Sequence, residues 1–386
     1  MPESIGPLIA ADEQFTHQIV DTHARVGTSE RSWTEKVCAQ ASARDGSFQL
    51  ALGLGKYTNR NVMDAYAGIS RGVEQWTVRS SRALAPDPET ATIGPIRYEV
   101  LEPLREVRFA LDANDAQPIA FEWIFTGTVP ASVENREVHV SRDRYRINAD
   151  VIRYHHVGTA RGWVELDGER TEFDDSSWIS TRDHSWGVRY EVGAPVPDIA
   201  PSPMPEGASA YVLWFPVSCA HSDGTPFGLH FYYQRFGFGG RSRLTFEGGI
   251  EHANGKREEF VAAVPDLRFD DATRRFQGGT ITVTMVDGTA REYRLSPVGA
   301  TGFHLAAGLY GGYDDHYHGQ WRGQSHLDGD YYPDCTLTAA VKKLRQHRLG
   351  LVRVEDPDGG VGYGDLQSIV TGPHPEIGLT EAGEIT

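Results

Sequence analysis

Two short motifs each occur twice in the chain, in the same order and at nearly the same spacing. The pattern Gly-x-x-Arg-Gly-x-x-x-Leu-Asp-Gly spans residues 158–168 and recurs at residues 319–329, 161 positions later. The pattern Arg-x-His-x-x-Gly spans residues 182–187 and recurs at residues 345–350, 163 positions later. Because two ordered motifs share nearly one shift, the sequence predicts two copies of one folding unit in tandem.

Each copy is predicted to be built from β-strands. Apolar and polar residues alternate in short segments such as 47–54, 96–102 and 120–128, and Asp-Gly, Asn-Asp and Pro residues punctuate them. This period of two predicts antiparallel strands with one buried face. Helical patterns of comparable length are missing from the sequence. We therefore expect an all-β protein made of two closed or nearly closed antiparallel barrels or sandwiches.

A proline-rich segment marks the expected boundary between the two copies. Residues 193–207 contain five prolines, which cannot sustain sheet hydrogen bonding and which stiffen a connector. The sequence thus predicts an N-terminal domain of residues 1–192, a linker of residues 193–207 and a C-terminal domain of residues 208–386. An ordered, proline-rich surface loop is the alternative interpretation of the same segment.

The net charge and composition exclude several classes of partner. A formal charge of −16 disfavours binding to nucleic acid or to an anionic membrane, since both reward basic surfaces. The 16 Tyr, 16 Phe and 8 Trp residues suffice for a core and an apolar pocket. Neither a secretion signal nor a membrane-spanning apolar segment is evident, and we expect a cytoplasmic protein. Nothing in the sequence indicates the oligomeric state.

The segment 182–189 is the densest in possible chemistry. In an extended strand, Arg182, His184 and Trp186 would share one face, and Asp183 and Ser185 would share the other. The Arg and His that both motif copies retain are expected to bond buried groups of the fold, and each Leu-Asp-Gly is expected to form a hairpin turn. The acid occurs only in the first copy, because the second copy has Gln346 at that position.

Asp183 is therefore the first catalytic candidate. A carboxyl group surrounded by aromatic side chains and little water has a raised pKa and can donate a proton. The aromatic residues near it in sequence, expected to wall the substrate pocket, are Trp163, Trp178, Trp186 and Tyr190. The alternative is an ion pair of Asp183 with Arg182 or Arg189, which would lower its pKa and leave it a structural role.

A second polar constellation lies at residues 310–318. Tyr310, Tyr313, His316 and His318 are expected to line the pocket, or else to form a structural cluster. His316 and His318 would share one face of a strand, next to two aspartates. A metal site needs further ligands that the sequence does not identify, so no metal is expected, although a metal-dependent hydrolase built on residues 314–318 remains an alternative.

Signatures of other enzyme classes are missing. The sequence contains no Gly-x-Ser-x-Gly elbow, no phosphate-binding Gly-rich loop and no dinucleotide fingerprint. We accordingly expect no cofactor.

The segments GWVELDG (residues 162–168) and RDHSWGVR (residues 182–189) resemble those of the superfamily of carotenoid 1,2-hydratases (hydroxyneurosporene synthases) and AttH-like proteins, which also includes natural-product cyclases. The resemblance implies two lipocalin-like barrels in tandem and cofactor-independent hydration or cyclisation of apolar, often polyene or terpenoid-like substrates. In the hydratases the expected proton donor is an acid on a barrel strand, and Asp183 is the matching position. Since no membrane-facing apolar segment is present, a smaller and soluble substrate is favoured over a carotenoid.

The resulting hypothesis is a cofactor-independent lyase or isomerase of the hydratase or cyclase type, acting on a small apolar unsaturated, terpenoid- or polyketide-like substrate. Asp183 would be the general acid, and His184 or Tyr190 would orient it or activate water. The rival hypothesis is a non-catalytic, lipocalin-like carrier of a small hydrophobic ligand.

Overall fold

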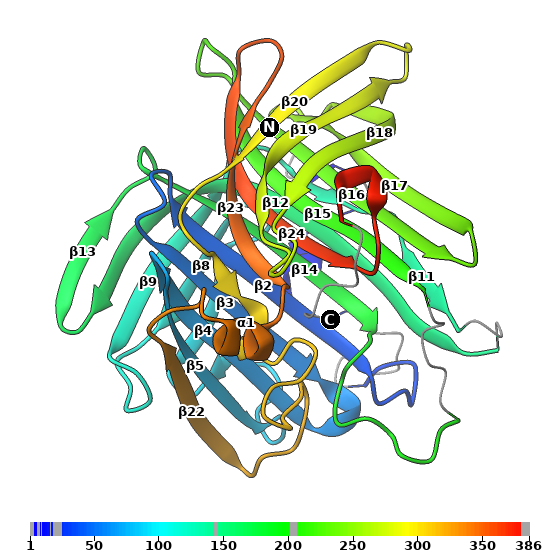
Figure 1. Cartoon of the computed structure of the whole chain (residues 1–386). Helices are drawn as coiled ribbons and strands as arrows, with labels where there is room; N and C mark the ends of the chain where they lie inside the picture. Colours follow the sequence, from blue (N-terminus) through cyan, green and yellow to red (C-terminus); the bar gives the residue numbers. More distant parts are fainter. Residues whose placement is uncertain are drawn as a thin grey trace.

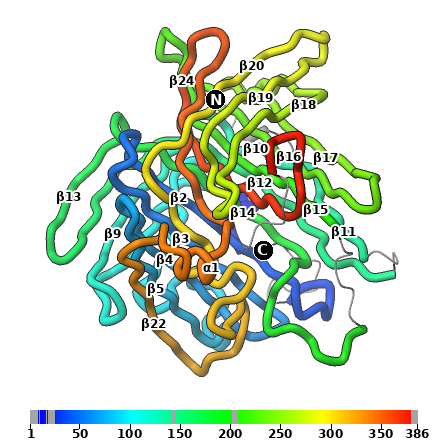
Figure 2. Tube along the Cα trace, viewed as in Figure 1, coloured from blue at the N-terminus to red at the C-terminus, as the bar shows by residue number. Residues whose placement is uncertain are grey.

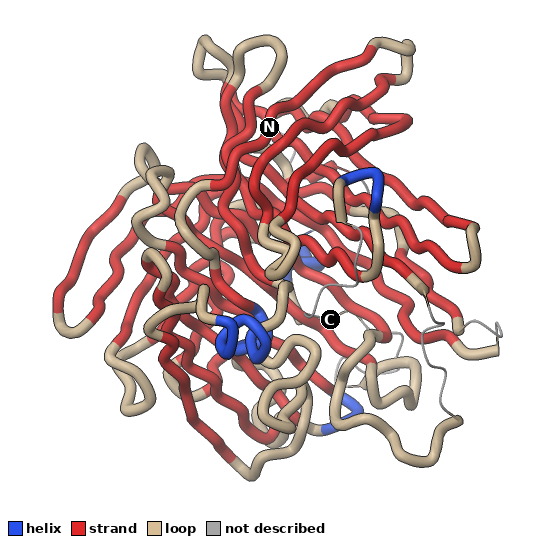
Figure 3. Tube along the Cα trace, in the orientation of Figure 1, coloured by secondary structure: helices blue, strands red, loops and turns tan. Residues whose placement is uncertain are grey.

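The computed structural model describes residues 4–5, 8, 10–15, 17, 25–141, 145–200 and 207–379. These residues form two β domains, an open curled sheet and a closed barrel, so the prediction of an all-β fold is confirmed (Figures 1 and 3). The one α-helix of the described residues is short, α1 (Thr338–Leu344). Four 3-10 turns complete the helical content: η1 (Ala10–Glu13), η2 (Thr58–Arg60), η3 (Leu305–Gly308) and η4 (Pro375–Ile377).

The first domain is a sheet whose main path contains eleven antiparallel strands and curls into a half-barrel. In spatial order these strands are β22 (Ser325–Tyr332), β5 (Glu74–Ala83), β4 (Val62–Arg71), β3 (Gln49–Tyr57), β2 (Trp33–Ala43), β14 (Trp178–Val188), β12 (Ile147–Leu166), β9 (Ile119–Gly127), β8 (Glu106–Leu111), β7 (Ile96–Glu102) and β6 (Thr92–Ile93). Four short strands join beside this path: β1 (Ser4–Ile5), β10 (Ala131–Val133), β11 (Glu137–Val140) and β13 (Glu169–Phe173).

The second domain is a closed barrel of eight antiparallel strands, since its first and last strands on the path, β20 and β23, also pair with each other. In spatial order the strands are β20 (Ala290–Pro297), β19 (Phe276–Met285), β18 (Arg257–Phe269), β17 (Arg241–His252), β16 (Pro226–Phe238), β15 (Ser209–Ala220), β24 (Val361–Thr371) and β23 (Arg348–Glu355). A two-residue strand, β21 (Phe303–His304), pairs with β23. Aromatic and aliphatic side chains such as Phe215, Phe231 and Tyr293 fill the barrel.

The central strands of the first sheet are buried on both faces. Every residue of β2 and β3 is buried, whereas a strand with one solvated face would alternate. One face packs into the half-barrel core, which includes Val37, Leu52 and Trp123. The other face packs against the second domain, where Cys38 and Tyr66 meet Phe303. The expectation of one buried face is therefore wrong for these strands, because the second domain covers what would have been the solvated side.

The two copies of the sequence motifs do not occupy equivalent places. In the first copy, Asp167 and Gly168 have positive φ and form the hairpin turn between β12 and β13, as expected. In the second copy, residues 327–329 lie inside strand β22, so the expected turn there is wrong. Likewise Arg182 lies within β14, whereas Arg345 ends helix α1. The similarity of the domains lies instead in their pairing order, because β14 pairs with β2 as β24 pairs with β15.

Strand β22 also departs from the expected division of the chain. It follows six strands of the barrel in sequence, yet it pairs with β5 at the edge of the first sheet (Figure 2). Residues 325–332, assigned from the sequence to the second domain, thus complete the first one. The expected linker falls partly on residues 201–206, which lie outside the described residues, and residues 193–200 contain no strand.

None of the helices among the described residues is long and apolar enough to cross a membrane.

Candidate active site

Strand β14 presents two chemically different faces, in the alternation expected from the sequence. Its even-numbered residues point into the half-barrel, and Asp183 and Ser185 point toward the second domain. Gly187 ends the regular part of the strand with φ +134, and a Cβ there would lie 2.0 Å from the carbonyl oxygen of Asp150. Only glycine can occupy position 187, because any side chain would collide with the Asp150 carbonyl. Two residues later, Arg189 lines the same cavity as Asp183.

The inner face of β14 holds a buried polar network. Arg182 donates from both terminal nitrogens to the Glu13 carboxylate at 2.7 Å, and both side chains are fully buried. Burial disfavours the Glu13 charge, but Arg182 outweighs it and lowers the pKa of Glu13 to about 2. His184 lies on this face, 3.0 Å from Glu35 and 3.2 Å from the Tyr154 hydroxyl. It therefore points away from Asp183 and is not placed to orient it.

On the outer face, the Asp183 carboxyl opens into a cavity of about 200 Å³ between the two domains. Strands β2, β12 and β14 supply one side of it, and strands β15 and β24 supply the other. The lining residues are Cys38, Arg153, Asp183, Arg189, Val212, Trp214, Tyr232, Tyr310, His347, Gln367 and Ile369. The cavity thus has a mixed wall of aromatic, aliphatic and polar side chains, two arginines among them, and a single carboxyl group.

The Asp183 carboxyl is poorly solvated and only lightly hydrogen-bonded. Burial raises its pKa, and the more distant charges of Arg153 and Arg189 oppose that rise without cancelling it. Its one hydrogen bond comes from the Ser185 hydroxyl at 3.2 Å. Of the residues that the structure describes, none forms an ion pair with it. The alternative of an Asp183 ion pair with Arg182 is therefore wrong, because Arg182 forms its ion pair with Glu13 on the opposite face of the strand.

A second cavity of about 220 Å³ adjoins the first and shares Arg153, Arg189, Tyr232 and Tyr310 with it. Its lining adds Lys36 and His318, whose side-chain nitrogens lie 2.8 Å apart, and Tyr190 at its rim. The Lys36 ammonium also lies 3.8 Å from the centre of the Tyr310 ring. The two cavities together exceed the roughly 300 Å³ at which small-molecule sites begin.

A chain of hydrogen bonds extends from the first cavity into the second domain. His347 and Gln367 both line the cavity, and the His347 ring nitrogen lies 3.1 Å from the Gln367 amide oxygen. The Gln367 amide donates to Asp365 at 2.9 Å. Burial raises the pKa of Asp365 to about 8, with a further contribution from the charge of Asp183. Asp365 is therefore a second buried acid that is protonated at neutral pH.

Several residues expected at the pocket lie elsewhere. Trp178 stacks on Phe173 in the half-barrel core, and Trp186 stacks on His17 on the inner face of β14. Trp163 packs under Arg170 on the β12–β13 hairpin. The tryptophan that does face Asp183 is Trp214, from the second domain.

The residues of segment 310–318 do not all lie at the cavities. Tyr310 and His318 line the cavities, whereas Tyr313 bonds the Tyr332 hydroxyl at 2.6 Å and packs near helix α1. His316 lies in the loop and faces neither cavity. Asp314 is exposed and pairs with Lys343 at 2.8 Å. The histidine and aspartate side chains therefore do not converge as a metal-dependent hydrolase would require.

The site residues that sequence patterns missed are Lys36, Arg153, Trp214, Asp365 and Gln367; the sequence suggested Arg189 only as an ion-pair partner of Asp183. A usable signal existed for Lys36, since the chain has few lysines and this one lies beside Glu35 in a strand whose other residues are uncharged. The others face Asp183 only because of strand register and domain packing, which no local pattern encodes.

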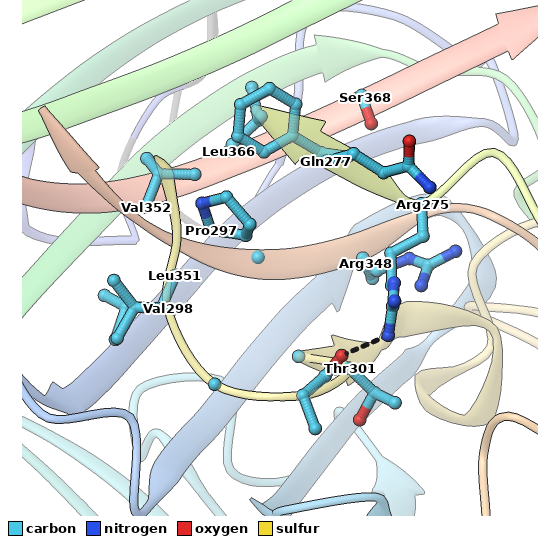
Figure 4. A pocket seen from close by; sticks show the side chains of 15 residues that line it. Arg275, Gln277, Pro297, Val298, Thr301, Arg348, Leu351, Val352, Leu366 and Ser368 are labelled. Carbon is cyan, nitrogen blue, oxygen red and sulfur yellow. Dashed lines mark hydrogen bonds between the residues drawn. The ribbon is translucent and has the colours of Figure 1, made fainter. Parts of the chain in front are cut away.

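A further cavity, of about 370 Å³, lies at one end of the closed barrel (Figure 4). Val352, Leu366 and Pro297 form its apolar part. Arg275 lies at its polar end and donates to the Ala300 carbonyl at 2.7 Å. Its lining contains no carboxyl group, so it could accept an apolar ligand but could not supply a proton.

Within the described part of the chain, two groups of side chains have the spacing of metal ligands, namely His17 with Glu35 and His184, and Glu134 with His155 and His230. In both, the carboxylate already accepts hydrogen bonds. Glu35 faces His17 at 2.7 Å, and Glu134 accepts from the Trp214 indole at 2.9 Å. The first group is thus satisfied without an ion. In the second, His230 lies 3.3 Å from Glu134, but neither of its ring nitrogens forms a hydrogen bond with the described residues.

Comparison with known proteins gives matches in structure but not with curated sequences, none of which matches the chain. An AttH protein from Nitrosomonas europaea is 12% identical, with a TM-score of 0.46 over 87% of this chain and 92% of that one. Kievitone hydratase from Nectria haematococca is 12% identical, with a TM-score of 0.41 over 93% of this chain and 98% of that one. CghA, in a structure with Sch210972, is 10% identical, with a TM-score of 0.48 over 96% of this chain and 98% of that one. At these identities the similarity concerns the fold and says nothing of substrate.

One family model matches nearly the whole chain, over residues 8–380. The chain therefore belongs to the family of unknown function DUF8625.

Proposed function

We propose that this protein is a cofactor-independent lyase or isomerase of the hydratase or cyclase type, which protonates a small unsaturated, terpenoid- or polyketide-like substrate from Asp183. The observation that carries the proposal is a half-buried carboxyl with a raised pKa, which has one hydrogen bond and no ion pair among the described residues and faces a cavity between two domains. Burial favours the neutral form of such a carboxyl group, which is the form that has a proton to give.

The surroundings of Asp183 suit proton transfer to an alkene carbon or to a departing hydroxyl. The π electrons or the oxygen lone pair take the proton, and positive charge develops on the adjacent carbon. The faces of Tyr310, Tyr232 and Trp214 can stabilise that charge by about 0.5–2 kcal/mol each. Arg153 and Arg189 stabilise the carboxylate that Asp183 leaves behind. Addition of water, loss of a proton or ring closure then completes the reaction.

The first experiment is native mass spectrometry of the purified protein, before and after denaturation. A co-purified unsaturated or hydroxylated compound would identify the substrate or product to use in the activity assay. With that compound, Asp183→Asn is expected to reduce kcat by about 10²–10⁴-fold, the usual contribution of a general acid. Asp175→Asn, at an exposed turn residue, serves as the matched control and should retain full activity. A folded Asp183→Asn protein with full turnover would refute the proposal.

A carrier of a small hydrophobic ligand is the second candidate, and the apolar cavity of about 370 Å³ in the closed barrel favours it. A carrier returns its ligand unchanged after prolonged incubation. In that case Leu366→Trp, which fills the barrel cavity, should abolish binding, whereas Asp183→Asn should leave it intact.

A further inference from the structure

We propose that the paired cavities contain an anion-binding recess, formed by Lys36 and Arg189, which holds a carboxylate or enolate group of the ligand. The inference rests on the proposed function only in taking these cavities as the substrate site. It adds a chemical class, because the substrate would be an unsaturated acid and not a purely apolar molecule.

Lys36 is a buried cation without an anionic partner. Its side chain is only 5% exposed, and its ammonium contacts the His318 ring nitrogen at 2.8 Å and the Tyr310 ring. Both contacts are to neutral groups, since burial and the charge of Lys36 lower the pKa of His318 to about 4. Across the described residues, Lys36 has no carboxylate within ion-pairing distance.

Arg189, which lies where the two cavities meet, likewise lacks an anionic partner among the described residues. Its guanidinium lines both of them and donates to the Ser185 hydroxyl. The Arg189 Nε is buried and lacks a hydrogen-bond partner. Throughout the part of the chain that the structure covers, no carboxylate pairs with this guanidinium either. A buried cation and a half-buried one that face one space without an ion-pair partner are unusual, because charges removed from water in proteins are nearly always paired.

The carboxylates nearest to these cations are engaged elsewhere. Asp64 accepts from the Gly319 amide at 2.6 Å. Glu137 lies 2.6 Å from His139 and 3.5 Å from Arg153. Glu191 lines the same cavity as Lys36 but is exposed to solvent, and Asp183 lines the neighbouring cavity with Arg189 without forming an ion pair among the described residues. A ligand anion is therefore the group that completes the recess, and guanidinium and ammonium donors suit carboxylate oxygens.

The position of the recess orients the ligand. An anionic group between Lys36 and Arg189 leaves the rest of a small molecule directed past Tyr310 into the cavity of Asp183, where Trp214, Val212 and Ile369 form an apolar wall. The double bond of an unsaturated acid would then lie beside the proposed proton donor.

The recess predicts a pH dependence of anion binding. Burial lowers the pKa of Lys36 to about 8. Since only the ammonium attracts an anion, affinity should fall about tenfold between pH 7 and pH 9. Of the other titratable groups facing Lys36, the pKa of Cys38 is near 12, those of Tyr57 and Tyr310 are raised well above their ordinary value, and that of Asp64 is lowered. Asp365, on the far side of Asp183, titrates in this window and would add to the fall.

The test uses trans-cinnamate and its neutral isostere trans-cinnamamide as probes, with affinities measured by calorimetry on the full-length protein. We expect cinnamate to bind at least tenfold more tightly than cinnamamide at pH 7. Lys36→Met and Arg189→Gln should each remove most of that preference and leave cinnamamide binding unchanged. Lys36→Arg should retain the preference and flatten its pH dependence. Arg161→Gln, on the same sheet but outside the cavities, is the matched control.

Both cation-removing variants are expected to fold with melting temperatures at or above that of the wild type, because each loses an unpaired buried charge. Equal affinity for the two probes, no binding of cinnamate at millimolar concentration, or a preference that survives both substitutions would overturn the proposal. Asp183→Asn should leave the cinnamate preference in place. A failure of the proposed acid chemistry is therefore distinguishable from a failure of the recess.

Discussion

Replacing Arg182 with methionine is expected to lower the free energy of unfolding by about 3–5 kcal/mol, the usual cost of leaving a buried charge without its partner. Arg182 lies at the centre of the strand that carries Asp183, yet its guanidinium serves the fold. It holds Glu13 with two bonds of 2.7 Å, in a region with no exposed surface on either side chain. Urea unfolding, followed by tryptophan fluorescence, measures the change.

The expected loss of stability is large because the Glu13 carboxylate is fully hydrogen-bonded in a buried site. Besides Arg182, its carboxylate accepts from the hydroxyls of Tyr98 and Tyr154 at 2.9 and 2.8 Å and from the amide of Leu104 at 2.8 Å. Through these bonds the segment Ala10–Glu13 is tied across β7 and β12. Without the guanidinium, the carboxylate must either remain charged in a dry site or take up a proton.

Two controls separate this pair from arginine loss in general. Arg161→Met removes a half-exposed arginine that pairs with Glu106 at 3.1 Å, and it should cost at most about 1 kcal/mol. The double variant Glu13→Gln, Arg182→Met should recover part of the loss, since neither charge then remains. Equal losses for Arg161→Met and Arg182→Met would contradict the assignment.

The same pair predicts acid sensitivity. The pKa of Glu13 is about 2 in the folded protein, below its ordinary value of 4.5, so the pair contributes its full stability above pH 4.5. That contribution is lost as the pH falls from 4.5 toward 2. The slope of stability against pH in this range should be smaller in the double variant than in the wild type.

The strand pattern predicts the fold class well, because period-two alternation is local information. It predicts the turn at Asp167 and Gly168 for the same reason, since a two-residue hairpin needs positive φ at both positions. The second Leu-Asp-Gly copy, at residues 327–329, gave a wrong prediction of a hairpin turn. Gly329 instead adopts an extended conformation and pairs with Val78. A short motif specifies a turn only when the flanking strands pair with each other, and here β22 pairs with β5.

The candidate acid could be predicted from the sequence, but most of its surroundings could not. The alternation that places Asp183 on one face of β14 also places Trp178, His184 and Trp186 on the other. Period-two reasoning applied consistently would have excluded all three as neighbours. Trp214 could not have been found, because it reaches Asp183 from the other domain through a packing that depends on both complete sheets.

Replacing Asp365 with asparagine is expected to stabilise the protein by about 3–5 kcal/mol at pH 8 and by little at pH 4. Burial raises the pKa of Asp365 to about 8 in the folded protein, above the ordinary value of 3.8. Between these values the unfolded chain has released the proton and the folded protein has kept it, so stability falls as the pH rises from about 4 to 8. Asparagine has no proton to lose, and its amide oxygen can still accept from Gln367.

The measurement is the midpoint of urea unfolding at pH 5, 6, 7 and 8 for the wild type, Asp365→Asn and the exposed control Asp112→Asn. The wild type and the control should lose stability in parallel across this range, and Asp365→Asn should lose less. Some slope should remain, because burial also raises the pKa of Asp183. Parallel slopes for all three proteins would show that Asp365 is ionised at neutral pH. The hydrogen-bonded chain from His347 through Gln367 would then end on a carboxylate.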